Sequence, residues 1–152
     1  SGLVGSEMCI RDSVGSGSLG MKNKDVQLLN GLALAYMGDA IYELYIRRYL
    51  LEKGSTKPNR LHQSATHYVS AKAQARLIDQ ALNQDLLTSE ELGIFKRGRN
   101  AKSYSKAKNT SQADYNKSSG FEAVMGYLYL TDQVGRLEEL INWCTRSVEA
   151  DL

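Results

Sequence analysis

The fold is decided by residues Leu32 to Leu51, which read LALAYMGDAIYELYIRRYLL. Fifteen of these 20 residues are apolar or aromatic, more than one amphipathic helix face requires. We predict a helix from about residue 30 to residue 53, roughly 36 Å long at about 1.5 Å per residue. Gly54 then ends it. Such a helix should be buried on most of its sides, as the central helix of a helical domain.

Helical patterns continue along the rest of the chain. Start signals and apolar spacing predict further helices over residues 56–68, 70–83, 89–96, 121–130 and 134–148. The intervening residues 98–117 are rich in Ser, Asn and Lys, which indicates a long loop or a frayed helix. Neither an alternating strand pattern nor an internal repeat competes with this interpretation. The prediction is an all-α fold with a single domain over residues 21–152.

Length and composition exclude several classes of protein. The chain has 152 residues, 42% hydrophobic and 24% charged, which suits one globular domain and argues against general disorder. Charges interrupt its most apolar stretch, so no uncharged span of about 20 residues could cross a membrane. Cys9 and Cys144 are too few for a secreted disulfide framework. We therefore expect a reduced, cytoplasmic protein.

The first twenty residues differ from the remainder. Ten of them are Gly or Ser, and they show neither apolar periodicity nor the hydrophobic core of a signal peptide. They resemble a translated vector or tag sequence ahead of a start at Met21. We expect this segment, residues 1–20, to be non-native and flexible, and exclude it from the fold prediction.

Basic residues concentrate in one short part of the chain. Between residues 96 and 108 there are six bases and no acid. These bases are Lys96, Arg97, Arg99, Lys102, Lys106 and Lys108. A concentration of this kind suggests a surface that faces a polyanion, while a solvated loop without a partner is the alternative.

Two acidic residues are candidates for chemistry, and each has an ordinary structural explanation. Asp39 follows Gly38 in the most apolar helix, where a buried carboxylate would need a partner or a metal. It could instead form an exposed stripe with Glu43 and Arg47. Glu122 could be a second carboxylate ligand for Mg²⁺, or it could only close a capping box that begins at Ser119. Because 83 residues separate Asp39 from Glu122, spacing alone cannot decide.

Four motifs, in order, resemble one enzyme family. Residues 34–43, LAYMGDAIYE, are similar to the signature helix of the ribonuclease III domain. Residues 121–130, FEAVMGYLYL, resemble the second acidic motif of that domain. Residues 97–103 and the segment 61–71 match the small bacterial branch called Mini-ribonuclease III. The resemblance extends from about Val26 to Cys144.

The resemblance implies an all-helical, homodimeric, Mg²⁺-dependent endonuclease that cuts double-stranded RNA. It also implies that the enzyme matures the 23S ribosomal RNA precursor and that it lacks the separate RNA-binding domain of the wider family. The resemblance leaves open whether a ribosomal protein presents the substrate. Asp39 and Glu122 correspond to the family's metal-binding and catalytic acids. The RNA-binding residues expected from the basic segment are Lys96, Arg97, Arg99, Asn100, Lys102, Lys106 and Lys108.

Two positions depart from the wider family. Ala35 stands where that family has a Glu, and Ser119 stands where it has an Asp. A reduced acidic set is typical of the Mini-ribonuclease III branch, but it leaves the number of metals and their inner ligands open. It also keeps an alternative in view, namely a catalytically inactive module that binds RNA or the ribosome. Retention of Asp39 and Glu122 argues against that alternative.

Overall fold

A computed structural model describes residues 21–101 and 109–152. The described residues form the helices α2 (Asn23–Gln27), α3 (Gly31–Glu52), α4 (Pro58–Val69), α5 (Ala71–Asn83), α6 (Ser89–Asn100), α7 (Gln112–Leu130) and α8 (Val134–Asp151). These ranges contain no strand, so the all-α prediction is confirmed. None of the described helices is long and apolar enough to cross a membrane. The expected tag at residues 1–20 lies outside the described residues, as do Lys102, Lys106 and Lys108.

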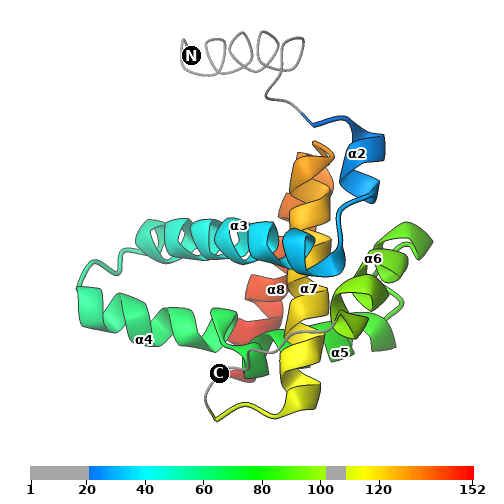
Figure 1. The fold of residues 1–152 in the computed structure, drawn as a ribbon. Coiled ribbons are helices and arrows are strands. Elements are labelled where there is room, and N and C mark those ends of the chain that lie inside the picture. The colour runs from blue at the N-terminus through cyan, green and yellow to red at the C-terminus, as the bar shows by residue number, and fades with distance from the viewer. Residues whose placement is uncertain (1–20, 102–108) are drawn as a thin grey trace, which may run out of the picture.

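Helix α3 has the predicted length but not the predicted burial. The Asn30 side chain caps its start by accepting a hydrogen bond of 2.8 Å from the Ala33 amide, and Lys53 follows its last residue. In the single chain only one face of α3 packs against α7 and α4 (Figure 1). The opposite face leaves Tyr36 82% and Leu44 62% exposed. The prediction of burial on most sides is therefore wrong for an isolated chain.

Helix α7 is longer than its apolar content predicts. It begins at Gln112, where the Ser111 hydroxyl accepts a hydrogen bond of 3.1 Å from the Asp114 amide. Residues 112–117, predicted as loop or frayed helix, are therefore helical. Ser119 lies well inside α7, so a capping box from Ser119 to Glu122 does not form. Helix α6 likewise continues past its predicted end to Asn100.

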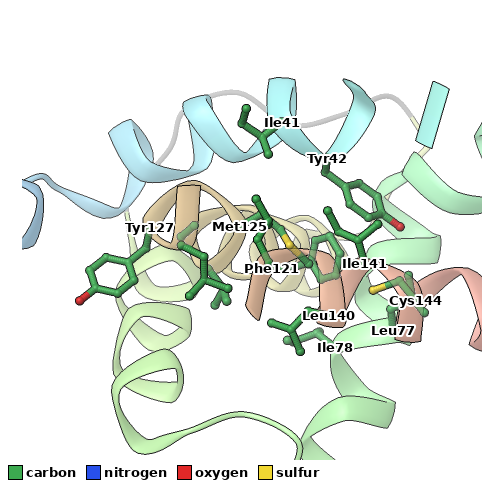
Figure 2. Packing of buried hydrophobic residues seen from close by; sticks show 14 of the residues in the cluster. Ile41, Tyr42, Leu77, Ile78, Phe121, Met125, Tyr127, Leu140, Ile141 and Cys144 are labelled. Carbon is green, nitrogen blue, oxygen red and sulfur yellow. The ribbon is translucent and has the colours of Figure 1, made fainter. Parts of the chain in front are cut away.

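Helix α7 is the centre of the domain. It packs against α3, α5, α6 and α8, which surround it (Figure 1). Figure 2 shows Phe121 of α7 beside Tyr42 of α3; their rings meet edge to face with centroids 4.9 Å apart. Cys144 of α8 is buried in the same core, and burial raises the pKa of its thiol. This agrees with the predicted packing role of Cys144.

A partly buried ion pair joins the start of α6 to α8. Thr88 and Glu91 form the capping box predicted from the sequence. Arg136 binds both carboxylate oxygens of Glu91, each at 2.9 Å, and also donates to the Leu86 carbonyl at 2.6 Å. Burial alone would raise the pKa of Glu91, but hydrogen bonds from Arg136 and Thr88 hold it below its usual value. The Glu91–Arg136 pair therefore fixes the first turn of α6 against α8.

Candidate active site

The candidate site is built where α3 crosses α7, and the crossing depends on two glycines. A Cβ atom at Gly38 would overlap the backbone carbonyl of Glu122. A Cβ atom at Gly126 would likewise overlap the carbonyl of Leu34. Only residues without a side chain allow two helix backbones to approach this closely. The glycines therefore bring the residue that follows Gly38 beside α7.

That residue is Asp39, and its neighbour on α7 is Glu122. Asp39 is exposed on the rim of the crossing, whereas Glu122 is half-buried beneath it. Burial raises the pKa of Glu122 to about 8, and two effects of Asp39 add to the rise: its charge, and a hydrogen bond that the protonated Glu122 donates to its carboxylate. Glu43 raises this pKa further, while a hydrogen bond from Gln74 opposes the rise. Folding thus brings together the two acids that the sequence places 83 residues apart.

The alternative explanation of Asp39, an exposed polar stripe with Glu43 and Arg47, also agrees with the structure. Arg47 donates a hydrogen bond of 2.9 Å to Glu43, one helical turn earlier. Asp39 lies one further turn toward the start of α3, in line with this ion pair. Both interpretations of Asp39 are therefore compatible with the structure. Its contact with Glu122 distinguishes it from an ordinary surface acid.

Gln74 of α5 is a member of the site that the sequence analysis missed. Its side chain is 1% exposed, and its Nε2 donates to the Val69 carbonyl at 3.2 Å and to Glu122 Oε2 at 3.4 Å. The Ser70 side chain caps the start of α5 and so fixes the turn from which Gln74 reaches α7. A signal was present in the sequence. Gln74 lies one turn before Ile78, on a face otherwise formed by small or apolar residues.

The donor set suits a hard divalent cation. Glu122 and Asp39 supply carboxylate oxygens, the ligands that Mg²⁺ prefers. Among the described residues, the side chains that shift the Glu122 pKa most are Asp39, Gln74 and Glu43, and none of these three is cationic. Two adjacent carboxylates are more stable with a positive charge between them. Within residues 21–101 and 109–152 no group of three or more His, Cys, Asp or Glu side chains is arranged to hold a metal. Ala35 and Ser119 are both 7% exposed and add no further acid.

The basic residues that the structure describes, Lys96, Arg97 and Arg99, lie at the end of α6, close to α7. Gly98 packs against Gly120 and the Ser119 carbonyl of α7, one turn before Glu122. Lys96 and Asn100 are exposed there, and the Arg99 guanidinium lies 5.4 Å from the centre of the Phe95 ring.

Arg97 differs from the other predicted RNA-binding residues. Its guanidinium donates to the Leu29 carbonyl just before α3 and is half-buried. The structure therefore gives Arg97 a contact that holds α6 against the start of α3. Lys102, Lys106 and Lys108 lie outside the described residues, so their positions relative to this surface stay predictions.

The raised Glu122 pKa predicts a pH-dependent stability. The protonated carboxyl favours the folded state below its unfolded pKa of 4.5, and this contribution is lost as the pH rises toward about 8. Glu122→Gln should therefore stabilise the metal-free protein at pH 7.5 by about 4 kcal/mol, or about 10 °C in Tm. At pH 4.5 the gain should be close to zero. Thermal melts in EDTA measure both, with Glu138→Gln, an exposed acid on α8, as control. Equal gains at the two pH values would contradict the assignment.

Comparison with known proteins identifies the family. Residues 32–133 match the Ribonuclease III domain family. A Mini-ribonuclease 3 from Streptococcus pneumoniae is 59% identical over 125 residues, covering 82% of this chain and 98% of that protein. A Mini-ribonuclease 3 from Enterococcus faecalis is 61% identical, with 82% and 95% coverage, and one from Staphylococcus aureus is 51% identical, with 80% and 90%.

The fold agrees with a solved structure. A crystal structure of a Fusobacterium nucleatum protein superposes with a TM-score of 0.69 at 30% identity, covering 84% of this chain and 98% of that one. The family match spans both α3, which carries Asp39, and α7, which carries Glu122. The chain therefore belongs to the ribonuclease III family, in its Mini-ribonuclease 3 branch, and is an endoribonuclease of that type.

Proposed function

We propose that this endoribonuclease cuts double-stranded RNA with Mg²⁺ held by Asp39 and Glu122, and that its substrate is the 23S ribosomal RNA precursor. The observation that carries the proposal is the α3–α7 crossing, which brings the two carboxyl groups into contact, with no cation among the side chains of residues 21–101 and 109–152 that most shift the Glu122 pKa. The similarity to three Mini-ribonuclease 3 proteins supports the same conclusion. We infer that a protein with this role acts in the cytoplasm.

The arrangement of the two acids suits hydrolysis of a phosphodiester. Asp39 is exposed, so a phosphate of a bound duplex can reach it. The half-buried Glu122 would supply a second carboxylate to the ion from the inner side of the crossing. A Mg²⁺ ion bound there would polarise the phosphate and activate water. The residues of this chain supply the charge that retains the ion and the fixed geometry in which the phosphate meets it.

The end of α6 is proposed to grip the RNA backbone. Lys96, Arg99 and Asn100, with Lys102, Lys106 and Lys108, would contact phosphates and the shallow minor groove. Arg97 contributes by anchoring α6 to the segment before α3, through its hydrogen bond to the Leu29 carbonyl.

Neutralising Lys96 and Arg99 should weaken RNA binding and reduce its salt dependence. Each phosphate contact adds close to one unit to the slope of log affinity against log salt, so the Lys96→Ala, Arg99→Ala protein should lose about 2 units. Turnover at saturating RNA should change much less, because these contacts act in binding. Filter binding at several salt concentrations measures the slope. Lys24→Ala, Arg146→Ala, two exposed bases on α2 and α8, is the matched control. An unchanged slope would mean that these side chains are merely solvated.

The exposed face of α3 supports a homodimer. Leu32, Tyr36, Leu44 and Leu51 leave an apolar stripe along it, and Leu28 just before α3 is 82% exposed. A monomeric protein rarely leaves this many large apolar side chains of one helix exposed. A two-fold axis would also place one site against each strand of a duplex.

Sedimentation should therefore give twice the 16.9 kDa chain mass at micromolar concentration. Tyr36→Glu places a charge in the centre of the stripe and should shift the protein to monomer by at least about tenfold in dissociation constant. Leu152→Glu, an exposed apolar residue at the other end of the chain, is the control. A wild-type monomer that still cuts both strands would contradict the dimer.

The substrate is tested with three RNAs. The purified protein should cleave the base-paired stem of a 23S precursor at a defined position in the presence of Mg²⁺. It should cut a shuffled duplex of equal length less selectively and leave the separated strands intact. Repeating the reaction with added ribosomal proteins tests whether one of them presents the stem. Random cleavage of the stem would contradict the precursor assignment, and binding without any cleavage would favour an inactive module.

A further inference from the structure

Gln74 is buried, donates a hydrogen bond to Glu122 of the candidate site, and has a side-chain oxygen without a hydrogen-bond partner among the described residues. It is 1% exposed, and its Oε1 is the one buried side-chain polar atom without a hydrogen-bond partner in the described parts of the chain. Leaving a buried amide oxygen without a partner costs free energy, and an apolar side chain of similar volume would avoid that cost. Gln74 is therefore poorly explained by packing.

The hydrogen bonds of Gln74 are both directed through its Nε2. One goes to the Val69 carbonyl at the end of α4, and the other goes to Glu122 Oε2 on α7. The Val69 contact fixes the plane of the amide, and so determines which hydrogen remains for the carboxylate. An amide held in this way can present its second N–H in one direction only.

The end of α4, which carries the Val69 carbonyl, is itself hydrogen-bonded to α3. The buried Tyr42 hydroxyl donates a hydrogen bond of 3.0 Å to the Tyr68 carbonyl, next to Val69. Tyr42 lies three residues after Asp39 on the same helix. The turn between α4 and α5 is therefore tied to α3 by Tyr42 and to Glu122 by Gln74. This connects the helices that carry the two acids by a route separate from the glycine crossing.

We propose that Gln74 is a positioning residue that orients the Glu122 carboxylate to receive Mg²⁺. The inference rests on the proposed function of Asp39 and Glu122 as the metal site. Side chains that hydrogen-bond a metal ligand fix its orientation, and their loss typically weakens metal binding about 10- to 100-fold. Gln74 thus acts on the affinity for the ion, and does not itself contact the reacting phosphate.

The test replaces Gln74 by Met, which keeps the volume and removes the amide. Mg²⁺ is titrated into the RNA-free protein while Tm is recorded, and the concentration that gives half the maximal rise is read. We expect this midpoint to increase at least about tenfold. The Tm in EDTA should stay equal or rise, because the unsatisfied Oε1 is gone. Cleavage should recover as Mg²⁺ is raised, with duplex affinity unchanged.

Gln80→Met is the matched control. Gln80 lies on the same helix, and its Nε2 donates to Asp151 Oδ2 at 3.4 Å, the length of the Gln74–Glu122 bond. Its Mg²⁺ midpoint should equal that of the wild type. Gln74→Leu repeats the test with a second side chain of similar volume, in case the Met variant folds poorly.

Two results would overturn the inference in distinguishable ways. If both Gln74 variants keep the wild-type Mg²⁺ midpoint, Gln74 does not position Glu122, whatever happens to Tm. A large fall of Tm with that midpoint unchanged would show that the amide only joins α4 and α5 to α7. If the wild type itself shows neither a Mg²⁺-dependent Tm nor Mg²⁺-dependent cleavage, the proposed metal site fails and the inference fails with it.

Discussion

Asp39→Asn protein should bind duplex RNA as tightly as the wild type and cleave it at least about a thousandfold more slowly. Asn keeps the volume of Asp39 but removes the charge that would retain Mg²⁺ beside Glu122. A thousandfold loss corresponds to about 4 kcal/mol of transition-state stabilisation. Single-turnover cleavage at saturating protein measures the chemical step, and filter binding in Ca²⁺ measures affinity. Glu122→Gln should lose activity to a similar extent.

The control for Asp39→Asn is another acid-to-amide change on the surface. Asp79 lies on α5 and accepts a hydrogen bond of 3.1 Å from Lys117 of α7, so Asp79→Asn removes a half-exposed ion pair that does not include Asp39 or Glu122. Its effect on stability should be below about 1 kcal/mol, and cleavage should be unaffected. Near-wild-type turnover by Asp39→Asn would show that Asp39 belongs only to the stripe with Glu43 and Arg47.

Gly38→Ala should destabilise the protein by about 4 kcal/mol and abolish cleavage of the fraction that remains folded. The new Cβ atom would overlap the backbone carbonyl of Glu122, which cannot move without shifting α7. Separating the helices would also separate Asp39 from Glu122. Urea unfolding measures the stability change, and cleavage under native conditions measures the second effect.

Gly93→Ala on α6 provides a matched comparison. It is the same substitution inside a helix, but no atom lies within 4 Å of the added Cβ. Ala has the higher helix propensity, so this variant should be more stable than the wild type by about 0.5–1 kcal/mol. If Gly38→Ala were tolerated as well as Gly93→Ala, the close crossing of α3 and α7 would be wrong.

Helix boundaries that depend on local capping residues were predictable from the sequence. The limits of α3 follow from Asn30 and Gly54, and the start of α6 follows from the capping box of Thr88 and Glu91. The start of α7 could not be found in this way, because residues 112–117 are polar and lack an apolar stripe. Tertiary contacts stabilise this part of α7 as a helix, because the next residues, Ser118 and Ser119, are buried against neighbouring helices. A prediction based on periodicity reads such residues as loop.

The sequence names two acids of the candidate site, but it does not predict how the structure brings them together. Asp39 and Glu122 stand out by type and by resemblance, yet their contact depends on Gly38 and Gly126, whose role appears only when two helices cross. Gln74 was missed because a single Gln among apolar residues is not a motif, and its hydrogen-bond partners lie on two other helices, α4 and α7. Arg97 was assigned by charge alone, whereas its position beside Leu29 is a tertiary feature.

The central claim is that Asp39 and Glu122 bind the Mg²⁺ with which this protein cuts duplex RNA. The most direct measurement is a single-turnover cleavage series on one duplex, starting from EDTA-treated protein and adding Mg²⁺ in steps. The account predicts that the bound duplex stays intact without the ion, and that cleavage of both strands appears as Mg²⁺ is added. Cleavage at the same rate in EDTA, or a bound duplex that remains uncut at saturating Mg²⁺, would contradict it.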